Sequence, residues 1–249
     1  MQSDTYISFY LPRTRLHIFS STIREIGNPK FIRFLVNEEE MQLVIQPYHK
    51  KDFKSHRVPT RRLSDRWEME ISSKIILIHG SSADQTADAV VNAANNRLLA
   101  GGGICGVIFK KAGMTQLTAA CSKFNTPLKD GSAVITPAFQ MKNAKYVIHA
   151  VGPNFSITPT AFKELFDAYY NSLVVLKDNG LHSISFPLIS SGIFGGNLDN
   201  PVAESTKQCC RAYNQFVADF PDYDVDVMVC AYSGASMLDA MPVFEALIK

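Results

Sequence analysis

Residues 89–106 read AVVNAANNRLLAGGGICG. The first three, 89–91, form a short apolar run of the kind that becomes a buried strand, and Asn92 follows it directly. A run of three glycines and a further glycine at 106 close the stretch. In open α/β sheets, ligands bind at the loops beyond the carboxyl ends of the strands. We therefore interpret residues 92–106 as a ligand-binding loop that follows a strand.

Strands and helices alternate outward from this stretch. Thr158-Pro159 and Asn200-Pro201 each join an N-cap side chain to a proline suited to the first helical position, so each predicts a helix start. Gly180 predicts the end of the first of these helices, and a third helix is expected over 236–248. The predicted strands are residues 75–78, 89–91, 133–136, 146–151, 184–189 and 225–232. This alternation favours an α/β fold with a mixed, mostly parallel sheet covered on both faces.

Two more loops follow predicted strands, at residues 190–196 (SSGIFGG) and 233–236. Two glycine-rich loops that bring backbone amides close to an anion suit a diphosphate better than a single phosphate. Asn95 offers a side chain that bridges hydroxyls or positions water, and Tyr232 at a strand end offers a face for stacking a base. Taken singly, each feature also has a plain structural explanation, because glycine loops are commonly tight turns and tyrosines are commonly core or surface aromatics.

Gly101, Gly103 and Gly106 satisfy the pattern G-x-G-x-x-G. A dinucleotide-binding fold requires the first glycine immediately after a strand and an acidic residue about 20 positions further on. Here nine residues separate Val91 from Gly101, and residues 121–123 contain no acid. The sequence therefore excludes a Rossmann interpretation, and without a Walker A lysine it also argues against an NTPase.

Six short motifs occur in a fixed order along the second part of the chain. They are VVNAAN (90–95), LLAGGGICGVI (98–108), KAG (111–113), AVITP (133–137), YVIHAVGP (146–153) and PLISSGIFG (187–195). Together they resemble the signature of the macrodomain family, over about residues 74–249. The resemblance implies a three-layer αβα sandwich that binds ADP-ribose. It also implies a hydrolase that removes mono-ADP-ribose from acidic side chains or deacetylates O-acetyl-ADP-ribose, with a non-catalytic ADP-ribose reader as the alternative.

The resemblance also assigns roles to individual positions. Asn95 would contact the distal ribose and help place the catalytic water, and Cys105 is the second candidate catalytic residue. Phe194 would lie over the distal ribose, and Tyr232 would stack on or edge the adenine. The ligand would be ADP-ribose, free or attached to a protein, and we expect no metal and no further cofactor. The candidate ligand-binding residues are Ser81, Ser82, Asn92, Asn95, Gly101, Gly102, Gly103, Ile104, Cys105, Gly106, Ser190, Ser191, Gly192, Ile193, Phe194 and Tyr232.

The chain departs from the family pattern at the expected adenine contact. Family members often carry a Gly-Asp pair whose aspartate accepts a hydrogen bond from the adenine amino group. This chain has Gly80-Ser81 there, and Asp84 is a carboxylate that would substitute if the loop bends inward. A serine accepts a hydrogen bond without charge, so selectivity for adenine is expected to be weaker.

A second departure concerns catalysis. Hydrolases of the mono-ADP-ribosyl type have an acid ten residues after the Asn95 equivalent, where this chain has Cys105, and they often have a histidine where it has Phe109. A thiol is mostly protonated at neutral pH and orients water poorly, which favours a reader. Some viral macrodomains that resemble this sequence have cysteine there and remain hydrolases, in which the substrate diphosphate would activate the water.

The N-terminal part has a different character. Residues 1–73 hold 12 basic and 9 acidic side chains, whereas residues 74–249 hold 13 basic and 14 acidic ones. The net charge of +2 therefore combines a basic first part with a slightly acidic second part. Strand-like runs predict a small β-rich module at 1–60, a basic linker at 61–73 and the macrodomain at 74–249. Residues 50–66 contain seven cations, which suit either a solvated linker or a contact with nucleic acid or a partner protein.

Composition limits the remaining classes. With 46% hydrophobic and 19% charged residues, the chain is typical of globular proteins and not of disordered ones. Five scattered cysteines in apolar surroundings predict neither a disulfide framework nor a zinc site. No apolar run approaches the length of a membrane span, so we expect a cytoplasmic protein without a membrane partner.

Overall fold

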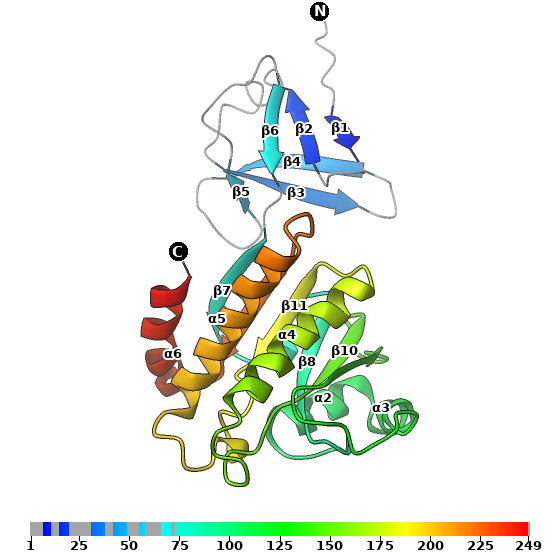
Figure 1. Ribbon diagram of the computed structural model, residues 1–249. Helices are drawn as coiled ribbons and strands as arrows, with labels where there is room; N and C mark the ends of the chain where they lie inside the picture. Colours follow the sequence, from blue (N-terminus) through cyan, green and yellow to red (C-terminus); the bar gives the residue numbers. More distant parts are fainter. Residues whose placement is uncertain are drawn as a thin grey trace, which may run out of the picture. The chain divides into compact units, whose positions relative to one another are not determined.

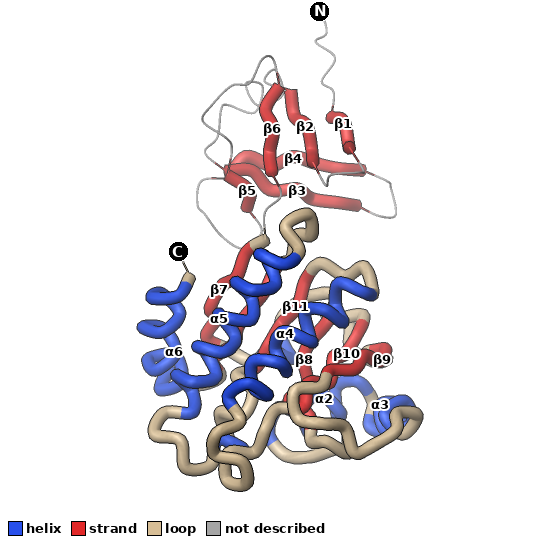
Figure 2. The backbone as a smooth tube through the Cα atoms, viewed as in Figure 1, coloured by secondary structure: helices blue, strands red, loops and turns tan. Residues whose placement is uncertain are grey.

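The computed structural model describes the backbone of residues 7–10, 15–19, 31–37, 42–48, 55–57 and 66–70, and residues 73–248 throughout. The chain divides into two compact units, residues 1–72 and 73–249 (Figures 1 and 2). Each unit has its own sheets, and the strands of one do not pair with those of the other among the described residues.

The first unit is described through six strands. They form two three-stranded antiparallel sheets, in the orders β1-β2-β6 and β4-β3-β5. Residues 66–70 of the predicted linker form β6, and residues 61–65 lie outside the described residues, as does most of the basic segment 50–66. A nucleic-acid contact through that segment therefore stays a prediction. The strands are β1 (Ile7–Tyr10), β2 (Arg15–Phe19), β3 (Phe31–Asn37), β4 (Gln42–Tyr48), β5 (Ser55–Arg57) and β6 (Arg66–Glu70).

A six-stranded sheet forms the centre of the second unit. Its strand order is β7-β12-β11-β8-β10-β9, and β9 runs antiparallel to β10 whereas the other neighbours are parallel. The predicted mixed, mostly parallel sheet is thereby confirmed. The strands are β7 (Lys74–His79), β8 (Ala89–Ala94), β9 (Ala133–Pro137), β10 (Tyr146–Val151), β11 (Ser183–Pro187) and β12 (Asp226–Ala231).

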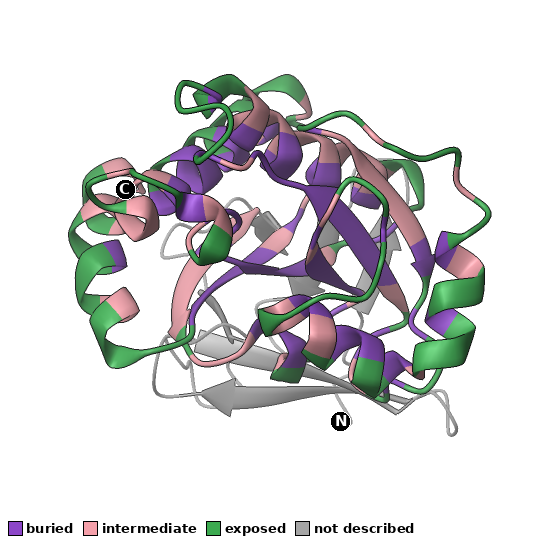
Figure 3. Cartoon of the chain, turned by 90° about the horizontal axis from the view of Figure 1, so that it is seen from below, coloured by how far each residue is buried: buried purple, intermediate pink, exposed green. Residues whose placement is uncertain are grey.

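Helices cover both faces of this sheet. α4 (Phe162–Asp178), α5 (Pro201–Asp219) and α6 (Gly234–Leu247) lie on one face, and α2 (Gly103–Ala112) and α3 (Met114–Cys121) lie on the other (Figure 1). Alternate side chains of one strand enter different cores, since Val91 packs with the first group of helices and Val90 with the second. Figure 3 shows the buried strands between the two helical layers. The αβα sandwich is therefore confirmed.

Local signals located two helix ends correctly and one incorrectly. Asn200 caps α5 by accepting a hydrogen bond from the Ala203 N–H at 2.9 Å. Gly180 follows α4 with φ +66°, and the next residue, Leu181, donates to the Leu176 carbonyl at 3.1 Å, which is a Schellman ending. The predicted start of α4 at Thr158-Pro159 is wrong. Residues 154–160 form successive turns instead, and α4 begins at Phe162.

The interpretation of residues 92–106 as one loop also needs correction. β8 continues through Ala94, so Asn92 belongs to the sheet, where it pairs with His149 of β10. α2 begins at Gly103, so residues 103–106 form the first turn of a helix. The true connection is therefore short, and it joins a strand end to a helix N-terminus.

The five cysteines are free, and each is buried. Within the part of the chain that the structure describes, no group of three or more His, Cys, Asp or Glu side chains is arranged to hold a metal ion. The helices described for residues 73–248 do not include one that is long and apolar enough to cross a bilayer.

Candidate functional site

A cleft of about 660 Å³ lies where the carboxyl ends of the parallel strands meet. Its walls come from the segments after β7, β8, β11 and β12 and from the first turns of α2 and α6. Fourteen of the sixteen candidate ligand-binding residues line it. These are Ser81, Ser82, Asn95, Gly101, Gly102, Gly103, Ile104, Cys105, Ser190, Ser191, Gly192, Ile193, Phe194 and Tyr232.

Asn92 and Gly106 do not line the cleft but lie behind its wall. Asn92 is fully buried, and its side-chain amide donates to His149 Nδ1 at 3.1 Å. His149 Nε2 lies 3.0 Å from Thr136 Oγ1, and burial lowers the pKa of His149 to about 4, so the ring is neutral. A Cβ on Gly106 would lie only 2.6 Å from the Gly101 carbonyl oxygen. Both residues are therefore expected to support the wall structurally instead of contacting a ligand.

Asn95 braces the segment that follows β8. Its Oδ1 accepts from the backbone N–H groups of Arg97 and Leu99 at 3.2 and 3.1 Å, and its Nδ2 donates to the Leu99 carbonyl at 2.7 Å. A Cβ placed on Gly101 would lie 3.9 Å from both Asn95 Nδ2 and Cys105 Sγ. The absence of a side chain at Gly101 thus leaves the cleft open between these two polar groups.

Cys105 lies in the first turn of α2 and is 5% exposed. Its Sγ donates a weak hydrogen bond to the Leu99 carbonyl at 3.7 Å. Burial raises the pKa of the Cys105 thiol, and hydrogen bonding with the Gly101 backbone and the Asn92 side chain opposes that effect only in part. The thiol is therefore protonated at neutral pH.

The opposite wall of the cleft is the segment after β11. Ser190 has a φ of +57°, which is unusual for a residue other than glycine, and it is 7% exposed. Its Oγ donates to the Pro153 carbonyl at 2.7 Å. A Cβ on Gly152 would lie 2.5 Å from that same Oγ, so the close approach of the two segments requires glycine there. This packing holds the Ser190 backbone in its left-handed conformation.

Sequence reasoning missed the pair of hydroxyls that fixes this wall from inside. Tyr169 of α4 accepts from the Ile189 N–H at 2.7 Å, and Ser205 of α5 donates to the Ile189 carbonyl at 2.6 Å. The two hydroxyl oxygens lie 2.7 Å apart, and Tyr169 is fully buried. Both backbone polar groups of Ile189 are thus satisfied by side chains from different helices. No local signal in the sequence connects Tyr169 to residue 189.

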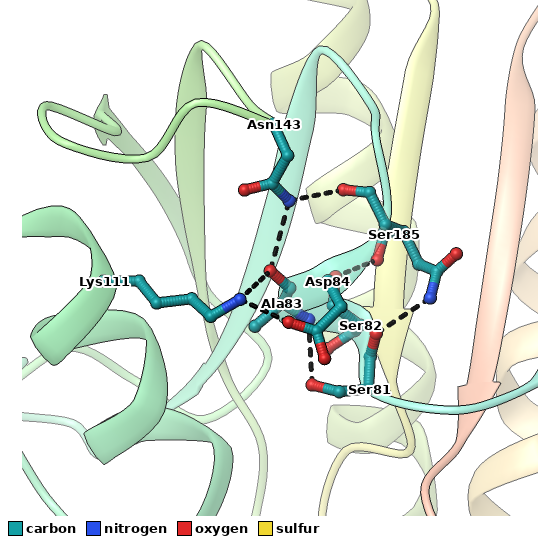
Figure 4. Close-up of polar contacts among 8 residues, drawn as sticks. Ser81, Ser82, Ala83, Asp84, Lys111, Asn143 and Ser185 are labelled. Carbon is teal, nitrogen blue, oxygen red and sulfur yellow. Dashed lines mark hydrogen bonds and ion pairs between the residues drawn. The ribbon is translucent and has the colours of Figure 1, made fainter.

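The remaining end of the cleft is built from Tyr232 and the segment after β7. Tyr232 is 80% exposed, and the adjoining Ala231 carbonyl accepts from the Gly80 N–H at 2.9 Å. Ser81 caps a 3₁₀ turn, Ser82–Asp84, by accepting from the Ala83 N–H at 3.3 Å (Figure 4). Asp84 is exposed, pairs with Lys111 and does not line the cleft. The expected substitution of Asp84 for the missing carboxylate is therefore wrong.

Among the described residues that line the cleft, there is no Asp, Glu, His, Lys or Arg. The lining consists of glycines, serines, one asparagine, one tyrosine, two cysteines and apolar side chains. Backbone N–H groups and helix N-termini, which carry partial positive charge, are then the groups left to hold an anion in this cleft. Diphosphate binding through the glycine-rich segments stays a prediction.

Comparisons with known proteins agree with this geometry. The family model for the Macro domain matches residues 91–204. A macro domain-containing protein of Streptomyces griseus is 38% identical over 135 residues, which cover 52% of this chain and 75% of that protein. The ADP-ribose glycohydrolase MACROD1 of Rattus norvegicus is 35% identical over 167 residues, which cover 66% of this chain and 62% of that protein.

Solved structures show the same architecture. The Oceanobacillus iheyensis macrodomain with ADP matches with a TM-score of 0.63 and 30% identity, over 72% of this chain and 94% of that one. The Trypanosoma brucei macrodomain in complex with ADP matches with a TM-score of 0.59 and 29% identity, over 68% of each chain. The second unit is thus an αβα sandwich with a glycine-lined cleft at the carboxyl edge of its sheet. The chain belongs to the macro domain family.

Proposed function

We propose that the cleft binds ADP-ribose and that the chain hydrolyses the bond between ADP-ribose and an acidic side chain of a protein. One observation carries the proposal of binding: two glycine-rich walls face each other across a cleft without charged side chains among the described residues. Such walls provide backbone N–H groups for a diphosphate. The solved relatives include macrodomains with ADP and with ADP-ribose, which supports the same ligand class.

The three parts of the cleft suit the three parts of this ligand. Tyr232 provides an exposed aromatic face for the base. The diphosphate fits between residues 101–103 and 190–194, where the backbone is least obstructed by side chains. The distal ribose then reaches Asn95 and Cys105, whose polar atoms flank Gly101.

Hydrolysis at this end of the cleft requires a water molecule and a group that removes its proton. Cys105 does not supply that group, because burial raises the pKa of its thiol. The described lining contains no carboxylate and no imidazole. The diphosphate of the substrate is then the base nearest to the reaction, with Asn95 orienting the water by hydrogen bonding. The names of the rat and mouse relatives, ADP-ribose glycohydrolases, support hydrolysis over binding alone.

The hydrolase proposal is tested by incubating a mono-ADP-ribosylated acceptor protein with the wild type and with Asn95→Ala. We expect the wild type to release the label and Asn95→Ala to release it at least about 10-fold more slowly, because the variant loses three hydrogen bonds that brace the wall. Asn96→Ala is the matched control, since the side chain of Asn96 is exposed on the same segment. A label that the wild type leaves intact after long incubation refutes hydrolysis.

A non-catalytic reader is the second candidate, and the protonated thiol at position 105 favours it. A reader binds ADP-ribose as tightly as the hydrolase does but leaves the acceptor modified. The same assay therefore separates the two, provided that binding is measured on the same preparation. O-acetyl-ADP-ribose, added as a second substrate, tests deacetylation at the same site.

A further inference from the structure

At the base end of the cleft, the segment after β7 combines a firmly held backbone with hydroxyls that have unused hydrogen-bonding capacity. Its backbone carbonyls are held by side chains from other elements: Ser82 O accepts from Ser185 Oγ at 2.7 Å, and Ala83 O accepts from Lys111 Nζ at 3.2 Å (Figure 4). Asn143 Nδ2 also donates to Ala83 O, at 3.1 Å. The 3₁₀ turn is therefore fixed in position from several sides.

The hydroxyls of Ser81 and Ser82 retain unused hydrogen-bonding capacity. Ser81 Oγ accepts from the Ala83 N–H, and its own O–H has no acceptor among the residues that the structure describes. Ser82 lines the cleft and is 2% exposed, and its Oγ has no hydrogen-bond partner among the described residues. A buried polar group without a partner is costly, so a ligand that pairs with it is stabilised.

No fixed charge accompanies these hydroxyls. Asp84 is the nearest carboxylate in sequence, but its exposed side chain pairs with Lys111 and does not line the cleft. Ser236 also lines the cleft and adds a third serine hydroxyl. The polar side chains at the base end are therefore hydroxyls only, within the described lining.

We propose that the base end of the cleft does not discriminate between 6-amino and 6-oxo purines, so that the hypoxanthine analogue of ADP-ribose is a ligand equal to ADP-ribose. This inference rests on the proposed function, because it takes the base to lie against Tyr232. Adenine presents an amino donor at position 6 and an acceptor at N1, whereas hypoxanthine presents a carbonyl acceptor and an N1–H donor. A serine hydroxyl donates and accepts, so it pairs with either pattern, whereas a carboxylate only accepts.

The test is a calorimetric titration of the full chain with ADP-ribose and with inosine diphosphate ribose. We expect the two Kd values to agree within about threefold, because each hydroxyl reorients at little cost. A wild type that binds ADP-ribose but binds the hypoxanthine analogue at least about 10-fold more weakly overturns the inference and leaves the proposed function standing. A wild type that binds neither ligand overturns both.

Two variants of Ser81 that match each other in shape test whether the serine hydroxyl is the cause of the equal affinity for the two ligands. Ser81→Asp keeps an N-cap side chain for the 3₁₀ turn but adds a carboxylate, so we expect the preference to shift at least about 10-fold toward adenine. The Asn side chain of Ser81→Asn has the same shape as that of Asp, and its amide offers either a donor or an acceptor. The Kd values for the two ligands are therefore expected to stay within about threefold of each other. The ratio is the readout, since any general loss of affinity or folding affects both ligands alike. Equal shifts in Asp and Asn variants would contradict the role assigned to the hydroxyl.

Discussion

The side chains of Asn95 and Cys105 donate to the same backbone carbonyl, that of Leu99, over 2.7 and 3.7 Å respectively. Asn95 directly follows β8, and Cys105 lies in the first turn of α2. The shared acceptor ties the two candidate catalytic residues to one short segment. In this arrangement Cys105 acts as a neutral hydrogen-bond donor.

Replacing Cys105 with serine tests this role. Ser retains a donor for the Leu99 carbonyl, so we expect kcat for de-ADP-ribosylation within about threefold of the wild type and an unchanged pH profile between pH 6 and 8.5. The reason is that the raised pKa keeps the wild-type thiol protonated over this range, so no activity depends on its ionisation.

A wild-type rate that climbs with pH, together with a large loss in Cys105→Ser, would instead identify a thiolate base. Cys105→Asp provides a second comparison. A higher rate in this variant means that a carboxylate base improves the reaction, and an unchanged rate means that the base lies elsewhere.

Tyr169→Phe is expected to destabilise the wall after β11. The substitution removes the hydroxyl that accepts from the buried Ile189 N–H, so the free energy of unfolding should fall by about 1–3 kcal/mol and the affinity for ADP-ribose should fall with it. Tyr170→Phe is the matched control, because that hydroxyl donates to Asp219 at the surface. Urea unfolding and calorimetry measure both quantities. Equal effects of the two variants would show that the Tyr169 hydroxyl does not hold the wall.

Gly106 and Gly102, in the segment between β8 and the first turn of α2, differ in the space available for a side chain. A Cβ on Gly106 would meet the Gly101 carbonyl at 2.6 Å, whereas a Cβ on Gly102 meets no atom within 4 Å. We expect Gly106→Ala to lower the free energy of unfolding by about 1–3 kcal/mol, in the range of overpacked sites, and Gly102→Ala to change it by less than about 0.5 kcal/mol. Thermal unfolding of the two variants decides the point, and a stable Gly106→Ala would contradict the packing assigned to α2.

The buried His149 predicts a pH-dependent stability. Its pKa is lowered to about 4 by burial, so below pH 6.5 the unfolded chain binds a proton that the folded chain excludes, and stability is lost as the pH falls from 6.5 toward 4. The expected loss is about 3 kcal/mol over that window.

Asp226 acts in the opposite direction, because burial raises its pKa to about 6 and the folded chain then binds the extra proton. Asp226 is present in both the wild type and His149→Gln, so its contribution cancels in the difference between their free energies of unfolding. That difference should shrink as the pH falls from 6.5 to 4, and a constant difference would mean that His149 does not carry the effect.

The sequence predicted those parts of the fold that local chemistry determines. Asn200 and Gly180 act within a few residues of themselves, so their roles as helix cap and helix end were predictable. Thr158-Pro159 has a similar local signal, but the turns that begin at Asn154 occupy those residues, and α4 starts three residues after Pro159. The same local signal, a capping residue followed by proline, therefore predicted the helix start correctly at Asn200 and incorrectly at Thr158.

The site was predictable where the backbone itself forms it and not where distant elements support it. The glycine-rich walls and Tyr232 line the cleft as expected. Asn92 was expected to contact the ligand, but its pairing partner His149 lies 57 residues away on another strand. The hydroxyls of Tyr169 and Ser205 meet at Ile189 only because α4 and α5 pack together. Such contacts depend on tertiary packing, which no single segment encodes.

Calorimetric titration of the full chain with ADP-ribose tests most directly whether the cleft binds this ligand. We predict one site per chain with a Kd in the micromolar range, which corresponds to a binding free energy of about −8 kcal/mol at 1 μM. The absence of binding heat with millimolar ADP-ribose, for a protein shown to be folded by its unfolding transition, would contradict the account.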